Sequence, residues 1–221
     1  MRDAILLSTA LITTADGAVN AEKRIEQYVS GLNQIISEYG KKNLDIYLID
    51  NTVENKFSLD PRLLMPISVL DPNKVIFFKD NQYGRANKGC GVVVQWKKIL
   101  PRILKKNKYL IHFEPRQKLI NFKFIEQCLE FKKNIFRKDV VRTKRFKIFN
   151  SEYPHFQTGM FGVETQKLFE FADGVDVEKM YKSKKSIEEL IYKFFVDNDY
   201  DHIAVKELGL LWDSGSCYLE I

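Results

Sequence analysis

The chain has 221 residues, a hydrophobic content of 45%, an aromatic content of 13% and a formal net charge of +6. This length and composition predict a folded chain, most simply one domain, with enough apolar residues for a core. No apolar run reaches the roughly 18 residues that a membrane-spanning helix needs. The first apolar run lacks a convincing cleavage site, so we expect a buried strand there and a cytoplasmic protein. The cysteines are widely spaced without a C-x-x-C pair, which indicates neither a disulfide framework nor a zinc site: Cys90, Cys128 and Cys217.

The basic residues are unevenly distributed along the chain. Between Lys97 and Lys147 there are seventeen Lys or Arg residues against four acids. This bias favours an anionic partner, although a solvated Lys-rich surface also explains it. Stacking platforms for single-stranded bases need exposed aromatics, whereas Phe122 and Phe136 fall on the predicted buried side of this stretch. We therefore expect an anionic acceptor or peripheral contact with a membrane surface, and no nucleic acid.

The first fifty residues predict a β-α-β unit. Residues 4–12 form an apolar run typical of a buried strand. Asn20 precedes an apolar stripe of period 3.6 that Gly40 ends, as expected of a capped amphipathic helix. Residues 44–49 form the second strand, and the length of the crossover requires the two strands to be parallel.

The remaining elements are predicted from shorter patterns. We expect strands at 74–78 and 109–113, with a helix between them through 92–103 whose far half is disturbed by Pro101. Asn121 is predicted to cap a further helix with Phe122, Ile125, Leu129 and Phe136 on one side. The elements expected after residue 140 are a strand at 145–149, a glycine-containing loop and strand at 156–163, a helix at 165–172, a helix opened by Ser186, and strands at 202–205 and 208–212.

Several common motifs are absent. The third glycine of a G-x-G-x-x-G fingerprint starting at Gly89 would fall at Val94, and no G-x-x-x-x-G-K-[ST] segment exists. The three histidines form no H-E-x-x-H pair, and Gly215-Ser216-Cys217 is no nucleophile elbow. These absences exclude a dinucleotide fingerprint, a P-loop and that class of metallohydrolase.

Polar side chains follow successive strands of the predicted sheet, where ligands of open α/β sheets bind. Taken one at a time, these groups also have structural explanations: an Asx turn, the residues that precede a helix, or an ion pair between Glu114 and Arg116. Glu189 lies three residues after Ser186 and can complete a capping box, which leaves Glu188 without a local role. The strand-end groups are Ser8 and Thr9, Asp50-Asn51-Thr52, Asn87-Lys88-Gly89, and His112-Phe113-Glu114 with Arg116.

In this order the groups resemble the nucleotide-sugar-dependent glycosyltransferases of the GT-A fold. The resemblance covers residues 4 to 120 well and the later part loosely. It implies that Ser8, Thr9 and Asp50 contact the nucleoside and that Asn87 and Lys88 start the donor-side helix. His112-Phe113-Glu114 stands where the family has its metal-binding D-x-D. Gln157-Thr158-Gly159-Met160-Phe161 matches the acceptor loop, and Glu188-Glu189 the catalytic carboxylate at a later helix start.

The histidine in place of the first aspartate weakens the case for a hard cation, which prefers oxygen ligands. Glu114 with water could hold Mg²⁺ or Mn²⁺, and Mn²⁺ accepts imidazole as well. Alternatively, Arg116 with nearby lysines neutralises the diphosphate without a metal. The sequence leaves both versions open.

We therefore expect one α/β domain over residues 1–221, with a mixed, mainly parallel sheet, a donor half at 1–120 and an acceptor half at 121–221. The expected reaction is sugar transfer, by an inverting enzyme, from a nucleoside diphosphate donor, with UDP-sugar favoured by resemblance, to a glycan or lipid-linked hydroxyl. A nucleotidyltransferase shares this sheet, but its Gly-rich, Arg-containing loop is missing, since residues 13–20 hold only Gly17 and no Arg or Lys. An α/β module that binds nucleic acid or an anionic surface through the basic 97–147 stretch is the non-enzymatic alternative.

Overall fold

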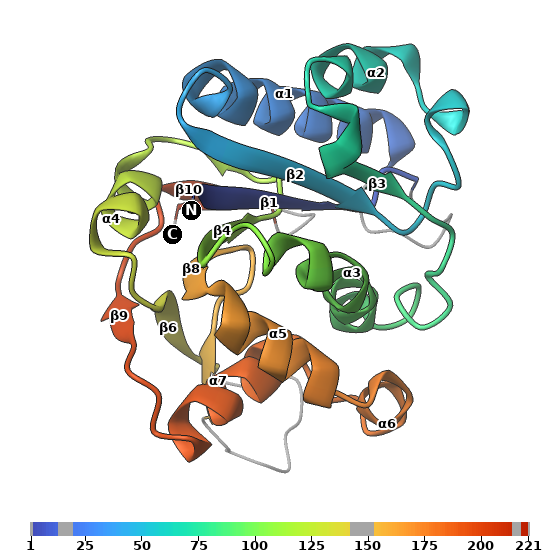
Figure 1. Ribbon diagram of the computed structural model, residues 1–221. Helices are drawn as coiled ribbons and strands as arrows, with labels where there is room; N and C mark the ends of the chain where they lie inside the picture. The colour runs from blue at the N-terminus through green and yellow to red at the C-terminus, as the bar shows by residue number, and fades with distance from the viewer. Residues whose placement is uncertain (1, 13–19, 142–152, 214–217, 221) are drawn as a thin grey trace.

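The computed structural model describes residues 2–12, 20–141, 153–213 and 218–220 (Figure 1). Helices and strands alternate through the first half, and the second half contains mostly shorter helices and strands. The elements are β1 (Asp3–Thr9), α1 (Ala21–Tyr39), β2 (Leu44–Asp50), η1 (Lys56–Ser58), α2 (Pro61–Ser68), η2 (Pro72–Lys74), β3 (Val75–Phe77), α3 (Lys88–Ile103), β4 (Tyr109–Phe113), β5 (Lys118–Leu119), α4 (Lys123–Phe131), β6 (Ile135–Val141), β7 (Tyr153–Phe156), β8 (Met160–Glu164), α5 (Thr165–Gly174), α6 (Val177–Lys182), α7 (Ile187–Asp197), β9 (Ile203–Val205), β10 (Leu210–Asp213) and β11 (Tyr218–Glu220).

A mixed sheet organises the described part of the chain, in the order β3-β2-β1-β4-β8-β6-β7 with β9 beside β6. The pairs among β3, β2, β1 and β4 are parallel, whereas β8 runs antiparallel to β4 and β6. The sheet thus passes without interruption from the predicted donor half into the predicted acceptor half. A small antiparallel sheet of β5, β10 and β11 lies beside it.

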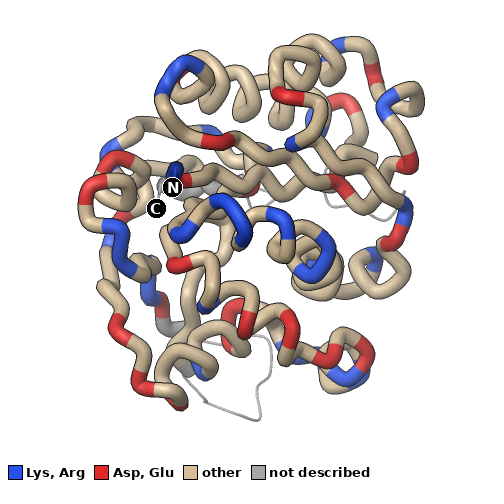
Figure 2. Tube along the Cα trace, in the orientation of Figure 1, with Lys and Arg blue, Asp and Glu red and all other residues tan. Residues whose placement is uncertain are grey.

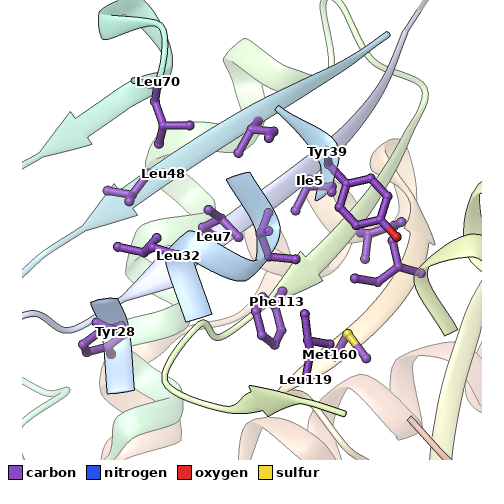
Figure 3. Close-up of a cluster of buried hydrophobic side chains, with 14 of the residues drawn as sticks. Ile5, Leu7, Tyr28, Leu32, Tyr39, Leu48, Leu70, Phe113, Leu119 and Met160 are labelled. Carbon is purple, nitrogen blue, oxygen red and sulfur yellow. The ribbon is translucent and has the colours of Figure 1, made fainter. Parts of the chain in front are cut away.

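Helices cover both faces of the large sheet (Figure 1). Apolar residues of α1, α2 and α4 form one core cluster with one face of the strands, and those of α3, α5, α6 and α7 form a second cluster with the other face. Figure 3 shows Leu32 and Tyr39 of α1 over Ile5 and Leu7 of β1 in the first cluster. Both faces of β1 and β2 are buried, which explains why their sequences are continuous apolar runs.

The first β-α-β unit forms as predicted. The Asn20 side chain accepts a hydrogen bond from the Lys23 N–H, and the Gly40 N–H closes the last turn on the Ile36 carbonyl. Strands β1 and β2 are parallel, with Ser8 opposite Ile49 and Thr9 opposite Asp50. Because the first strand ends at Thr9, residues 10–12 lie beyond the sheet, where the prediction had extended it.

A glycine of α1 fixes the loop after β4. A Cβ at Gly31 would overlap the Pro115 carbonyl oxygen, so this helix and the loop touch backbone to backbone. Gln34 adds two hydrogen bonds, because its side chain donates to the Leu119 carbonyl at 2.9 Å and accepts from the Leu119 N–H at 3.1 Å. The loop that carries Glu114 and Arg116 is therefore held against α1.

Other predictions need correction in detail. Phe136, expected on a helix, lies in β6, and α4 ends earlier at Phe131. Asn121 caps its helix from one position further out, since it accepts from the Lys123 N–H while Phe122 occupies the N-cap. The strand predicted at 145–149 lies outside the described residues. In the described ranges, no helix combines the length and the apolarity needed to cross a membrane.

Candidate active site

A cavity of about 320 Å³ opens where β1, β2 and β4 end. Five segments bring residues to it: the end of β1, the first turns of α1, Asn51 directly after β2, the turn and helix start from Asn81 to Gln95, and the loop after β4. This is the edge of a parallel sheet at which ligands bind. The lining residues are Ser8, Thr9, Ala10, Ile12, Arg24, Tyr28, Asn51, Asn81, Gly84, Arg85, Lys88, Gly91, Val92, Gln95, Glu114 and Arg116.

Asp50 lies behind this cavity and organises its wall. The carboxylate is fully buried and accepts hydrogen bonds from the Thr9 hydroxyl at 2.9 Å and the Leu11 N–H at 2.7 Å. It also accepts from the N–H and hydroxyl of Thr52 and from the Val53 N–H, at 2.6 to 3.0 Å. Burial raises the pKa of Asp50, and these donors counteract the shift. Both oxygens of the Asp50 carboxylate are thus engaged by hydrogen bonds within the protein. Its predicted contact with the nucleoside remains a prediction.

An amide network joins α3 to the strand ends. The Gln95 side chain donates to the Thr9 carbonyl at 2.6 Å and to the Asn51 side chain at 2.8 Å. Asn51 in turn donates to the carbonyls of Asp80 and Gly91. Ser8 lines the same cavity, and its buried hydroxyl has no hydrogen-bond partner in the described part of the chain. The floor of the cavity is therefore rigid and polar.

Positive charge dominates the wall of the cavity. Four cationic side chains line it, Arg24, Arg85, Lys88 and Arg116, and the only carboxylate among its lining residues is Glu114. Glu114 pairs with Arg116, whose guanidinium nitrogens lie 2.8 and 2.9 Å from the carboxylate. Desolvation, reinforced by the Arg116 and Arg24 charges, lowers the pKa of Lys88. An anionic ligand would relieve this concentration of like charge.

Arg24 and Tyr28 were missed as site residues by the sequence analysis. They lie four residues apart on α1, so both point from the same helix face toward the sheet. Tyr28 accepts a hydrogen bond from the Ala10 N–H at 2.8 Å, and burial raises its pKa to about 12. An arginine on the apolar face of a helix was the signal available in the sequence, because a buried guanidinium needs an anionic or polar partner.

The predicted donor-side helix start is present. Asn87 caps α3 by accepting from the Gly89 N–H, and its side-chain amide donates to the Lys185 carbonyl. Lys88, the next residue, reaches the cavity. A Cβ at Gly89 would crowd Ile187 at 2.9 Å, so α3 and α7 pack closely at their first turns. Asn87 thus acts as a cap and a link to the α7 side, while Lys88 faces the candidate ligand site.

His112 does not line the cavity. Its imidazole is fully buried on the opposite side of β4, stacked on Phe161 at 4.9 Å and edge-on to Trp96 at 5.1 Å. Burial lowers the pKa of His112 to about 4, with Glu114 acting in the opposite direction. Of the His112-Phe113-Glu114 triplet, only Glu114 reaches the cavity, and the ligand contact expected of His112 stays a prediction that this placement does not favour.

The donor set fits a metal ion poorly. Glu114 is the one carboxylate on the cavity wall and is paired with Arg116, while His112 faces the aromatic core. In the ranges that the structure describes, no three His, Cys, Asp or Glu side chains lie together as a metal site would require. A hard cation prefers several oxygen ligands, which these residues do not provide.

The loop at residues 157–159 connects Glu114 to Glu188. The Glu114 N–H donates to the Gly159 carbonyl at 2.8 Å, and the Thr158 hydroxyl donates to the Glu188 carboxylate at 3.0 Å. Glu189 has a different role: its N–H donates to the Ser186 cap, and its carboxylate pairs with Lys193 at 2.6 Å. Ser186 caps α7 through the Glu189 N–H, as the spacing predicts, but no bond from the Glu189 side chain back to Ser186 completes a capping box among the described residues. Glu188 is the member of the pair that faces the predicted acceptor loop.

The comparisons with known proteins support the fold. No protein-family model matches the chain. No curated protein matches it either. Among solved structures, 4-diphosphocytidyl-2C-methyl-D-erythritol synthase from Anaerococcus prevotii has a TM-score of 0.55 at 9% identity, over 92% of this chain and 86% of its own.

A second similar structure, from Desulfovibrio desulfuricans, is provisionally described as a nucleotide-diphospho-sugar transferase. Its TM-score is 0.54 at 8% identity, over 93% of this chain and 80% of its own. At such low identity the likeness concerns the fold alone. The chain shares a Rossmann-like α/β fold with both structures and has the mixed, mainly parallel sheet predicted from the sequence.

Proposed function

We propose that this chain is a nucleotide-sugar-dependent glycosyltransferase, which moves a sugar from a nucleoside diphosphate donor to a hydroxyl of a glycan or lipid-linked acceptor. The observation that carries the proposal is the cavity at the strand ends, whose wall holds four cationic side chains and one carboxylate. A nucleoside diphosphate supplies the negative charge that such a wall lacks. Uridine as the base follows from the family resemblance.

The proposed reaction places positive charge where the leaving group becomes more negative. The acceptor oxygen attacks the anomeric carbon of the donor sugar while the bond from that carbon to the diphosphate oxygen breaks. Arg116, Lys88 and Arg24 stabilise the departing diphosphate, because preorganised charges act most strongly where charge develops. Desolvated Lys88 gains most from an anionic neighbour, since its charged form is disfavoured without one.

We assign the general base to Glu188. Its carboxylate, held by Thr158 beside the loop that also binds the Glu114 backbone, would take the acceptor hydroxyl proton in an inverting reaction. Glu189, paired with Lys193, serves the helix. This division supports the sequence-based choice between the two carboxylates.

We propose that the charge on the diphosphate is neutralised by side chains and not by Mn²⁺ or Mg²⁺, because Glu114 is engaged by Arg116. Addition of a strong chelator to the purified protein is expected to leave donor turnover unchanged. Loss of turnover that returns with Mn²⁺ or Mg²⁺ would instead establish a metal on Glu114 with water and phosphate ligands.

The decisive experiment is calorimetric titration with UDP, UMP and uridine, followed by turnover of UDP-sugars. Affinity should increase with each phosphate and fall with salt, since charge provides the binding energy. Arg116→Gln should reduce the affinity for UDP, and Arg102→Gln at the far end of α3 is the matched control. Equal affinity for UDP and uridine would contradict the proposal.

A nucleotidyltransferase is the second candidate, because the first similar structure is named as a 4-diphosphocytidyl-2C-methyl-D-erythritol synthase. The sequence argument against it, the lack of Arg and Lys in residues 13–20, concerns a segment outside the described residues, except for Asn20. Arg24 supplies a cation from the helix that follows this segment. Incubation with a nucleoside triphosphate and a sugar phosphate separates the two: release of pyrophosphate would favour this candidate over glycosyl transfer.

A further inference from the structure

The net charge of the chain resides in one short stretch. Residues 97–108 contain six Lys or Arg and no acid, which equals the net charge of +6 of the whole chain. In the structure this stretch is the second half of α3 and the turn that leads into β4. Figure 2 shows the blue segments gathered along this helix and turn. This stretch therefore contains no acid of its own to balance its charge, and the rest of the chain has equal numbers of basic and acidic residues.

Four side chains of this stretch and one from a neighbouring segment form a surface that we call the basic surface: Lys98, Arg102, Lys105 and Lys106, with Lys74. Lys98 and Arg102 are four residues apart and so lie on the same face of α3. Arg102, Lys105 and Lys106 line a hollow of about 460 Å³ together with Lys74, the last residue of η2. Two elements distant in the sequence thus meet to concentrate charge.

Most of this charge is not neutralised within the described part of the chain. Lys74 pairs with Asp45 at 2.8 Å and lies 3.7 Å from Asp71. No ion pair with Arg102, Lys105 or Lys106 is found among the described residues, and all three are exposed. The mutual repulsion of these cations destabilises the protein in solution, and an anionic surface would relieve that repulsion.

The basic surface is separate from the candidate active site. Lys88 at the first residue of α3 reaches the cavity, whereas Arg102 and the following turn lie at the other end of the 16-residue helix. At 1.5 Å per residue this is a separation of about 20 Å or more. A small anionic acceptor cannot contact the basic surface and the cavity together, so this charge has a different partner.

We propose that the basic surface docks the protein on an anionic lipid membrane. Clusters of four to eight basic residues on an amphipathic helix are attracted to acidic headgroups. Nucleic acid fits less well, because sequence-tolerant binding of single strands uses exposed aromatic platforms. Tyr47, the aromatic residue that lines the hollow, is buried. This inference is independent of the proposed function.

The test is co-sedimentation of the whole protein with lipid vesicles. It should bind vesicles in which phosphatidylserine replaces about a third of the phosphatidylcholine, not bind phosphatidylcholine alone, and dissociate at high salt. The triple variant R102E/K105E/K106E should bind about a hundredfold more weakly, at about fivefold for each basic residue lost. The matched control K41E/K56E/K206E changes net charge equally, through exposed lysines elsewhere, and should retain most of the binding.

Equal loss of binding in the two triple variants would overturn the proposal, since net charge alone would then explain the binding. So would oligonucleotide binding at moderate salt that is tighter than vesicle binding and lost in R102E/K105E/K106E. UDP affinity measured on the same variants should be unchanged. Vesicle binding without UDP binding would contradict only the proposed function. UDP binding without vesicle binding would contradict only the proposed membrane role of the basic surface.

Discussion

The Thr158 hydroxyl donates a hydrogen bond to the Glu188 carboxylate at 3.0 Å. Thr158 is buried on a loop between β7 and β8, and Glu188 lies in the first turn of α7. The contact joins segments thirty residues apart and fixes one carboxylate oxygen. Among the described residues no hydrogen bond reaches the other oxygen, and this oxygen is the one that we expect to face the acceptor.

The first prediction follows from the proposed role of Glu188. Glu188→Gln keeps the size of the side chain but cannot accept a proton, so turnover should fall by about a hundredfold or more while UDP affinity is unchanged. Steady-state kinetics and calorimetry measure the two quantities. Glu189→Gln is the control, and should cost on the order of 1 kcal/mol of stability or less. An inactive Glu189→Gln beside an active Glu188→Gln would reverse the assignment.

The second prediction concerns the hydroxyl that positions this carboxylate. Thr158→Val should lower kcat with little change in UDP affinity, whereas Thr158→Ser, which retains the hydroxyl, should recover much of the activity. A purely structural role would instead lower the melting temperature of both variants alike. The comparison of kcat, affinity and melting temperature across the two variants distinguishes the two explanations.

The third prediction concerns the cationic wall. Arg24→Gln and Arg116→Gln should each weaken UDP binding by about tenfold or more, because a hydrogen bond to a charged group contributes about 1.5 to 3 kcal/mol. Uridine affinity should be nearly the same in both variants and in the wild type. Arg102→Gln, near the end of α3 and away from the cavity, provides the control. Unchanged UDP affinity in Arg24→Gln would remove α1 from the ligand site.

The fourth prediction separates the structural role of Asp50 from its predicted ligand role. The Asp50 carboxylate accepts five hydrogen bonds. Asp50→Asn replaces one of its oxygens by an NH₂ group that faces other donors, so the free energy of unfolding should fall by about 1 to 3 kcal/mol. Urea denaturation measures this, with exposed Glu54→Gln expected within about 0.5 kcal/mol of wild type. A stable Asp50→Asn variant that fails to bind UDP would restore the predicted nucleoside contact.

The fifth prediction is a pH dependence of stability due to His112. The pKa is about 4 in the folded chain and has its ordinary value of 6.5 in the unfolded chain. Between these values the unfolded chain binds more protons, so stability falls as the pH falls. From pH 7 to pH 5 this group should account for about 2 kcal/mol. His112→Phe should lose less stability over that interval than wild type, and an identical loss would show that other groups titrate.

The first half of the fold could be predicted because its signals are local. The apolar runs of β1 and β2 and the stripe of α1 are each complete within one segment. Helix α2 is absent from the predicted elements because Pro61 and Pro66 interrupt its sequence. Pro61 sits at the first helical position, where its missing N–H costs nothing, and Asp60 caps the turn. Phe136 was placed on a helix because its spacing from Leu129 also fits a period of 3.6.

The candidate site was predictable where polar residues follow a strand or begin the next helix. Glu114 and Arg116 reach the cavity from the loop after β4, and Lys88 reaches it from the first turn of α3. Arg24 and Arg85 were missed, since their placement depends on how a helix and a turn pack on the sheet. His112 shows the converse, because alternation along β4 turns its side chain toward Trp96 and Phe161 whatever its polarity.

The direct backbone contact between Gly31 and Pro115 means that α1 cannot shift without displacing the loop after β4. The Gln34–Leu119 hydrogen bonds fasten the same two segments a second time. Arg24 and Arg116, which come from these segments, therefore keep a constant spacing, and a diphosphate meets them already arranged. A methyl group at Gly31 would alter that spacing from two helical turns away, and so impair ligand capture without changing any atom that touches the ligand.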